Sequence, residues 1–274
     1  MNPQIAELIE IGPTLEPTPF AAPEVSDDFA RRLHGHLDVT SLDTRDSPLK
    51  VIILARAARE TPPGAEPVAT VCVYPALVVA ARMELEPTSI QVSTVAGGYP
   101  HGLSTMESAV SDIQSCAAMA VREIEIPVPL YMVFSQDWRA LTAWVREMKK
   151  AASPCAVKVV LPASEIGDRR TIYRASLCCL DAGADFVVNA ARGESGEVSL
   201  EQSEAIMQAV AVYREQTGRS RGFKAFGSVR TLQDAALYWG LACAVMGENE
   251  LTAYSFRMGA AELLDEIRQR LMPA

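Results

Sequence analysis

The feature that most constrains this chain is an alternation along its whole length: short runs rich in β-branched residues are followed by longer, alanine-rich amphipathic segments. Eight runs are typical of buried parallel strands: 37–40, 70–73, 89–95, 123–126, 157–161, 186–189, 222–225 and 242–246. The helical patterns between and after them cover 47–60, 74–84, 105–121, 138–152, 169–182, 200–216, 231–239 and 260–271. Eight strand–helix units predict an α/β fold, a single (β/α)8 TIM barrel with its active site at the carboxyl ends of the strands. An open doubly wound sheet is the alternative, but no glycine-rich dinucleotide turn follows the first strand.

Length and composition agree with one barrel. The chain has 274 residues, 49% of them apolar and 22% charged, and a TIM barrel needs about 250. Residues 1–26 hold five of the 17 prolines, whereas the later sequence shows one composition throughout. We therefore predict a short N-terminal arm over residues 1–26 and a barrel over residues 27–274.

The charge balance excludes some partners. Acidic residues outnumber basic ones by 34 to 25, and such a surface repels nucleic acid and anionic membranes. The uncharged stretch 67–81 is too short to span a bilayer, and the first 20 residues lack the basic region of a secretory signal, so we expect a cytoplasmic protein. Six scattered cysteines and three histidines predict reduced thiols and no structural metal; we expect no cofactor.

Five charged residues lie inside the predicted strands, where an unpaired charge is costly to bury: Asp38, Glu123, Glu125, Lys158 and Lys224. Glu123 and Glu125 are two residues apart and so point to the same side of their strand. If these side chains meet inside the barrel, they offer a carboxylate for proton transfer and a lysine that can form an imine with a carbonyl compound. Alternatively, they are structural ion pairs between neighbouring strands.

Eight segments, in order and spacing, resemble deoxyribose-phosphate aldolase and its class I aldolase relatives: LDVTSL, ATVCVYP, YPHG, EIEI, KVVLP, AGADFVV, GFKAFGSVRT and FRMGAAELL. The match covers about residues 37–265. The resemblance implies a TIM barrel that reversibly cleaves deoxyribose phosphate to acetaldehyde and glyceraldehyde phosphate without a metal. It also makes a homodimer plausible.

Four positions match the catalytic pattern of this family. The resemblance assigns Asp38 to its strand-one aspartate, Cys72 to its strand-two cysteine and Lys224 to its strand-seven lysine. Glu125 replaces the strand-four aspartate with a carboxylate that is one methylene longer. The catalytic set expected from the resemblance is therefore Lys224, Glu125 and Asp38, with Lys158 as a further amine.

Two parts of the family's site differ in this chain. The imine-forming lysine on strand six falls on Val188, or on Asn189 after a one-residue shift, and no lysine occurs between Lys158 and Lys224. The phosphate-binding stretches carry Glu194, Glu197 and Glu262 in place of small or hydroxyl residues, and carboxylates repel a phosphate. Gly227, Ser228 and Arg230 could still hold an anion. The expected substrate-binding residues are Cys72, Val188, Asn189, Gly227, Ser228, Arg230 and Gly259.

Three functions fit these residues. The first is an aldolase-like carbon–carbon lyase for a small aldehyde or sugar-type carbonyl compound, with the imine on Lys224 or on Lys158 and Glu125 as proton shuttle. The second is a cofactor-free lyase, isomerase or cyclase in which Lys224 is a fixed cation and Glu125 the base. The third is a non-catalytic aldolase homologue that binds a ligand or a partner.

Overall fold

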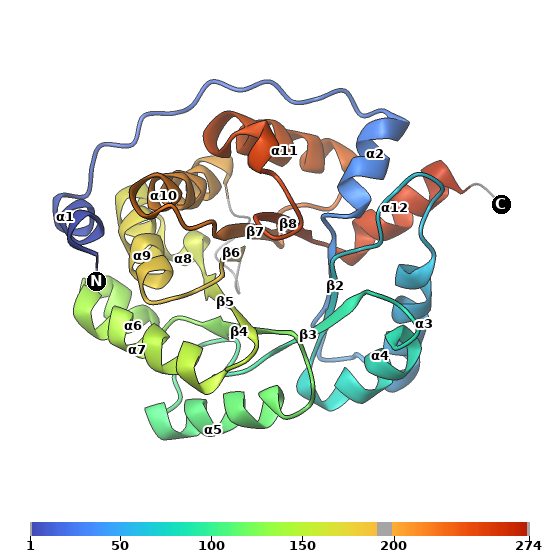
Figure 1. Cartoon of the computed structure of the whole chain (residues 1–274), viewed down its shortest axis with the longest axis horizontal. Helices are drawn as coiled ribbons and strands as arrows, with labels where there is room; N and C mark the ends of the chain where they lie inside the picture. Colours follow the sequence, from blue (N-terminus) through green and yellow to red (C-terminus); the bar gives the residue numbers. More distant parts are fainter. Residues whose placement is uncertain (1, 191–198, 273–274) are drawn as a thin grey trace.

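The computed structural model describes residues 2–190 and 199–272. Eight parallel strands follow one another around a single sheet in chain order, and Figure 1 shows them surrounded by helices. A bridge between Leu37 and Met258 joins the two edges, so the sheet closes into a (β/α)8 TIM barrel, as the sequence predicts. The strands are β1 (Asp38–Ser41), β2 (Thr70–Val73), β3 (Gln91–Val95), β4 (Glu123–Pro127), β5 (Ala156–Leu161), β6 (Phe186–Ala190), β7 (Gly222–Phe226) and β8 (Phe256–Gly259).

The helices form the outer layer. Seven of the helices in the described part of the chain begin after a serine, threonine or aspartate whose side chain accepts a hydrogen bond from the first turn, as Ser47, Asp168 and Thr231 do. The described helices are α1 (Pro3–Ile11), α2 (Asp27–His34), α3 (Pro48–Arg59), α4 (Val78–Leu85), α5 (Met106–Ala117), α6 (Leu130–Phe134), α7 (Trp138–Ala151), α8 (Ala163–Ile166), α9 (Arg169–Asp181), α10 (Leu200–Thr217), α11 (Leu232–Met246) and α12 (Ala261–Leu271), with 3-10 turns η1 (Pro75–Leu77) and η2 (Glu248–Glu250).

The eighth predicted strand is wrong. Residues 242–246 form the last turns of α11, and β8 lies later, at Phe256–Gly259. The helix carries no charge after Asp234, so its apolar end has no polar face that would reveal a helical period. The other seven predicted strands lie within two residues of the observed ones at either end.

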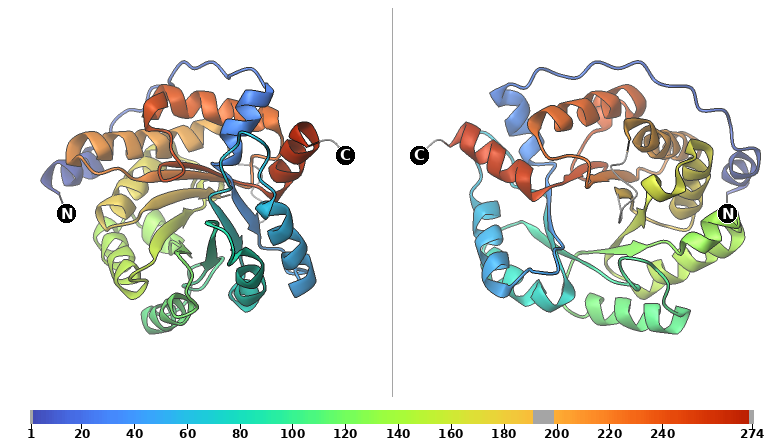
Figure 2. Two further views of the ribbon diagram at one scale, coloured as in Figure 1. Left: turned by 45° about the vertical axis from the view of Figure 1, so that its right-hand side comes forward. Right: turned by 180° about the vertical axis from the view of Figure 1, so that it is seen from behind.

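The N-terminal segment crosses the outside of the barrel. Helix α1 packs against α9 and α10 through Ile5 and Ile9, which are buried. The chain then runs without regular structure to α2, which packs against α12 (Figure 1). Helices α1 and α12 lie on opposite sides of the ring in Figure 2. The division into an arm and a barrel at residue 26 stays a prediction.

Apolar side chains fill two separate regions. The larger core lies between the sheet and the helices. A small second cluster of Val160, Val188 and Ala190, with Tyr99 and Phe226 packed on it, lies inside the barrel. Among the described residues, no helix combines the length and the apolar character that crossing a membrane requires.

Candidate active site

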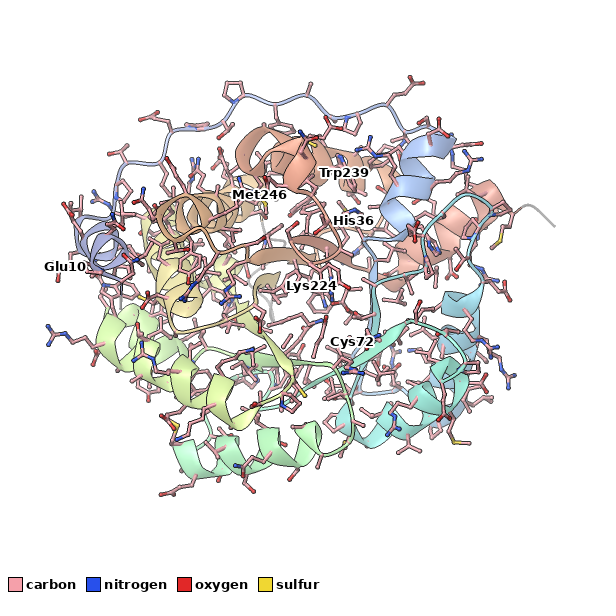
Figure 3. The ribbon with its side chains drawn as sticks, viewed as in Figure 1. Glu10, His36, Cys72, Lys224, Trp239 and Met246 are labelled. Atoms are coloured by element: carbon pink, nitrogen blue, oxygen red, sulfur yellow. The ribbon has the colours of Figure 1, made fainter. Side chains whose placement is uncertain are left out.

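The strand register directs the charged residues of the strands into the lumen of the barrel. Glu125 is paired with Lys158 across β4 and β5, and Lys224 with Arg257 across β7 and β8. Neighbours in register on adjacent parallel strands point to the same face of a sheet. Figure 3 shows Lys224 and Cys72 near the barrel axis. The lumen thus contains the charged residues that the sequence places in strands, which come from β1, β4, β5 and β7, together with Arg257 from β8.

Lys158 lies at the centre of this group. Its Nζ is 2.5 Å from Asp38 Oδ2, 2.9 Å from Glu125 Oε1 and 3.0 Å from Glu123 Oε2. The Lys158 side chain is completely buried. Burial acts to lower the pKa of Lys158, but the three carboxylates raise it well above its usual value. Lys158 is therefore held as a cation.

Lys224 is the second amine of the lumen. Its Nζ is 2.6 Å from Glu125 Oε1 and 3.1 Å from Asp38 Oδ2, and it donates a hydrogen bond to Thr40 Oγ1 at 3.1 Å. A Cβ atom at Gly259 would lie 2.5 Å from Lys224 Cε, so the absence of a side chain there makes room for the lysine. The amine of Lys224 is thus in direct contact with a carboxylate that can exchange a proton with it.

A third cation closes the amino-terminal end of the lumen. Arg257 of β8 donates two hydrogen bonds to Glu123, at 2.6 and 2.8 Å, and lies over the ring of Phe186. Glu123 also contacts Lys158. Three carboxylates (Asp38, Glu123, Glu125) therefore face three cations (Lys158, Lys224, Arg257) in one buried network, and the formal charges balance.

The cations control the ionisation of the acids. Burial acts to raise the pKa of Asp38, but Lys158, Lys224 and Arg257 outweigh it and hold this pKa well below its usual range. The pKa of Glu123 is also lowered, since Lys158 and Arg257 outweigh the effect of burial. For Cys72, burial and then Glu125 raise the pKa of the thiol to about 12. Cys72 is therefore a neutral thiol near neutral pH and a poor nucleophile.

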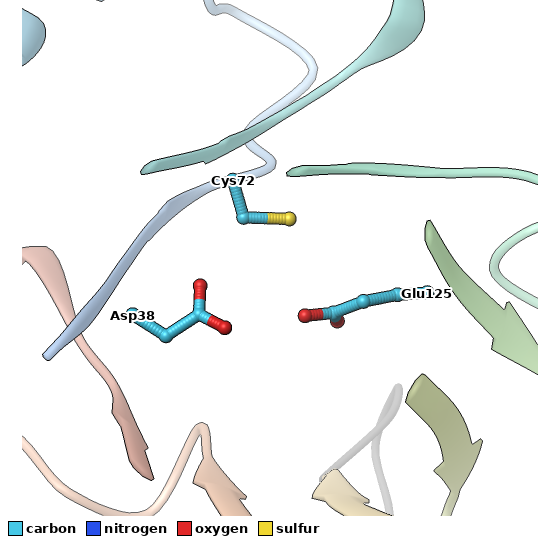
Figure 4. A group of neighbouring side chains, drawn as sticks. All are labelled: Asp38, Cys72 and Glu125. Atoms are coloured by element: carbon cyan, nitrogen blue, oxygen red, sulfur yellow. The ribbon is translucent and has the colours of Figure 1, made fainter. Parts of the chain in front are cut away.

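Asp38, Cys72 and Glu125 also form a group that could in principle bind a metal. Their ligand atoms lie within 4.8 Å of one another, and Figure 4 shows the two carboxylates facing each other beside the thiol. However, Asp38 and Glu125 each contact both Lys158 and Lys224, and the thiol is protonated. This donor set fits the two ammonium groups better than a divalent cation.

Position 188 contributes only hydrocarbon to the lumen. Val188 is paired with Lys224 across β6 and β7 and is completely buried in the small apolar cluster. The next residue, Asn189, points away from the lumen: its Nδ2 donates to Ser203 Oγ of α10 at 2.5 Å. Asn189 is therefore not adjacent to Lys224. Glu194 and Glu197 lie outside the described residues.

A cavity of about 610 Å³ opens at the carboxyl ends of β1, β7 and β8. Thr40, Phe226 and Gly259 line it, and all three are neighbours of Lys224. Gly227 and Arg230 line it as well. Ser228, which lies between them in the sequence, and Cys72, in the lumen, are not part of its wall. A second cavity of about 700 Å³ lies at the opposite end of the barrel, and the buried residues Glu123 and Arg257 form part of its wall.

Sequence reasoning missed Arg257 and Thr40. Arg257 was missed because the eighth strand is predicted at residues 242–246, before the observed one. An arginine within the apolar run FRMG is nevertheless the same kind of signal that identifies Lys158 and Lys224. Thr40 is two residues after Asp38 and so shares its face by the period of a strand.

Comparison with known proteins agrees with this architecture. No family model matches the chain. A putative deoxyribose-phosphate aldolase from Caenorhabditis elegans is 30% identical over 243 residues, which cover 87% of this chain and 80% of that protein. The deoxyribose-phosphate aldolase of Mus musculus is 30% identical over 205 residues, 74% of this chain but 64% of the mouse protein.

Solved structures show the same fold. A putative deoxyribose-phosphate aldolase from Toxoplasma gondii superposes with a TM-score of 0.78 at 21% identity, covering 89% of this chain and 94% of that one. One from Coccidioides immitis gives a TM-score of 0.76 at 22% identity and covers 98% of both chains. The fold and the lumen define a TIM-barrel protein with amines and carboxylates inside the barrel. From the sequence relationship, the chain belongs to the deoxyribose-phosphate aldolase family.

Proposed function

We propose that this chain is an aldolase-type carbon–carbon lyase for a small carbonyl compound, with Lys224 as the reacting amine and Glu125 as the proton acceptor and donor. The observation that carries this proposal is the distance of 2.6 Å between Lys224 Nζ and Glu125 Oε1, next to a cavity and beside the hydrocarbon of Val188. The names of the relatives support the reaction class. The family's imine lysine is absent at position 188, so the amine has to come from elsewhere in the lumen.

Glu125 and Lys224 can carry out the steps that an imine mechanism needs. Lys224 has to lose a proton before it attacks a carbonyl carbon, and Glu125 is within hydrogen-bond distance to accept that proton. Glu125 can then return it to the hydroxyl that leaves as water when the imine forms. The imine withdraws electrons from the carbon–carbon bond that breaks.

The neighbouring residues hold this pair in place. Asp38 and the Thr40 hydroxyl both contact Lys224 Nζ, each at 3.1 Å, and so restrict the position of the amine. Lys158, as a permanent cation, keeps Asp38 and Glu123 ionised. We assign Lys158 and Asp38 to orientation and charge, and Lys224 and Glu125 to the chemistry. The wall residues Gly227, Arg230 and Gly259 would contact the substrate.

A second candidate keeps the pair but forms no imine. Two carboxylates lie within 3.1 Å of Lys224 Nζ, and such surroundings also suit a lysine that stays a cation. That cation would stabilise an enolate while Glu125 acts as the base. Lys224→Arg separates the two mechanisms because arginine keeps the charge but cannot form an imine at neutral pH.

The test measures acetaldehyde release from 2-deoxyribose and from its 5-phosphate. The imine mechanism predicts that Lys224→Arg loses about a thousandfold or more in rate, and that Glu125→Gln loses a similar factor. Lys149→Arg is the matched control, since Lys149 pairs with Asp185 outside the lumen. Substantial activity in Lys224→Arg would favour the second candidate. A wild-type rate no higher than buffer would instead favour a non-catalytic binding protein. The homodimer stays a prediction.

A further inference from the structure

We propose that the cavity above Lys224 selects an uncharged carbonyl compound with an apolar end, and that Glu262 and Asp265 exclude phosphate esters from it. This inference rests on the proposed function, because it takes the cavity at the carboxyl ends of β1, β7 and β8 as the substrate site. It names the class of substrate that this site accepts.

Lys224 is completely buried and does not itself line the cavity, but it lies directly behind the cavity wall. Three residues of its wall are neighbours of Lys224: Thr40 accepts its hydrogen bond, Gly259 leaves the space that its stem fills, and the Phe226 ring centroid is 5.3 Å from its Nζ. A substrate whose carbonyl group reaches Lys224 would therefore extend its remaining atoms along this wall.

Two basic residues of the wall are already neutralised by acids outside it. Lys50 Nζ is 2.5 Å from Asp46 Oδ1, whose side chain is almost completely buried. Arg268 forms an ion pair with Glu60. Each cation would therefore share its charge between its own carboxylate and a phosphate.

Three charged residues of the cavity wall form no ion pair within residues 2–190 and 199–272, and two of the three are acidic. The two acidic residues, Glu262 and Asp265, lie on the first two turns of α12 and line this cavity. The basic one is Arg230. Glu262 lies in the first turn, where the partial positive charge of a helix would otherwise attract an anion. A phosphate in this cavity would thus meet two carboxylates and one guanidinium.

Hydrocarbon forms another part of the wall. Leu42 and, from α3, Ile53, Leu54 and Ala57 line the cavity. Ile53 is 58% exposed, although a large aliphatic side chain gains from burial. A short alkyl chain in the cavity would cover part of this surface, whereas a phosphate would gain nothing from it.

Three probes test the inference by binding, which is measured by saturation-transfer NMR and calorimetry independently of turnover. They are n-pentanal, D-glyceraldehyde and D-glyceraldehyde 3-phosphate; the last two differ only by the phosphate. We expect n-pentanal to bind at least tenfold more tightly than the phosphate ester, and D-glyceraldehyde to bind more tightly than its phosphate. The isosteric double variant Glu262→Gln with Asp265→Asn should improve binding of the phosphate ester by about fivefold for each carboxylate removed, which is the effect of one full repulsion at about 4 Å in water. It should leave the binding of n-pentanal unchanged.

Glu107→Gln is the matched control, since Glu107 on α5 is an acidic residue that does not line the cavity. Tighter binding of the phosphate ester than of D-glyceraldehyde by the wild type would overturn the inference. A double variant that binds the phosphate ester no better than Glu107→Gln would overturn it as well, and so would a failure of every neutral aldehyde to bind. Selective binding of n-pentanal without any turnover would overturn the lyase proposal alone and leave the ligand class intact.

Discussion

Replacing Arg257 by methionine tests whether the lumen depends on balanced charge. Arg257 donates two hydrogen bonds to Glu123, which is 7% exposed. Removing one partner of a buried ion pair costs about 3–5 kcal/mol, because the other charge is left without compensation. Lys158 stays 3.0 Å from Glu123 in the variant, so we expect a value near the lower limit, about 3 kcal/mol.

A second variant separates charge from packing. Glu123→Gln combined with Arg257→Met removes one charge of each sign, so that Asp38 and Glu125 then face Lys158 and Lys224. We expect the double variant to recover about 2 kcal/mol of the loss, since no buried charge is left over. The assay is the free energy of unfolding from urea titration followed by circular dichroism.

Arg45→Met is the control for this experiment. Arg45 pairs with Asp43, but its side chain is 86% exposed, and such pairs contribute less than about 1 kcal/mol. If Arg257→Met lowers the free energy of unfolding by no more than Arg45→Met does, the ion pair of Arg257 with Glu123 does not stabilise the lumen. If the double variant is no more stable than Arg257→Met, lost packing rather than an unbalanced charge explains the destabilisation.

Three further predictions follow from the lumen. The pKa values of Asp38 and Glu123 are lowered and that of Lys158 is raised, so we expect these three groups to contribute fully to the free energy of unfolding from about pH 5 to about pH 9. The contribution of the two acids is lost as the pH falls below this range, and that of Lys158 as the pH rises above it. A maximum of the free energy of unfolding near pH 4, measured by urea titration, would contradict this. With a thiol pKa of about 12, Cys72 should resist iodoacetamide at pH 8 in the native protein and react after unfolding, as peptide mapping would show; rapid native labelling would refute its burial. Gly259→Ala places a Cβ 2.5 Å from Lys224 Cε, so we expect a loss of about 1–3 kcal/mol in stability and at least tenfold in turnover, and unchanged values would show that Lys224 lies elsewhere.

Most of the barrel could be predicted from local sequence. Seven strands combine β-branched residues with clear ends, and the period of two already places Glu123 and Glu125 on one face. The eighth strand could not be located in this way. The apolar end of α11 resembles a strand in composition, and the real β8 has only four residues with Arg257 among them.

The contents of the lumen could be predicted only in part. Asp38, Glu125, Lys158 and Lys224 stand out because charges within buried strands need partners. Sequence patterns do not give distances across the barrel, so they could not show that Lys158 contacts three carboxylates while Lys224 contacts two. Whether the side chain of Asn189 or that of Val188 points into the lumen depends on the register of β6 against β7, which the sequence left open by one residue.

Reductive trapping with acetaldehyde and borohydride, followed by peptide mapping, tests most directly whether Lys224 is the reacting amine. We expect an ethyl adduct on Lys224 at higher occupancy than on Lys158, which three carboxylates hold as a cation, and none at position 224 in Lys224→Arg. Adducts on exposed lysines such as Lys150, with Lys224 left unmodified, would contradict the assignment of Lys224 as the reacting amine.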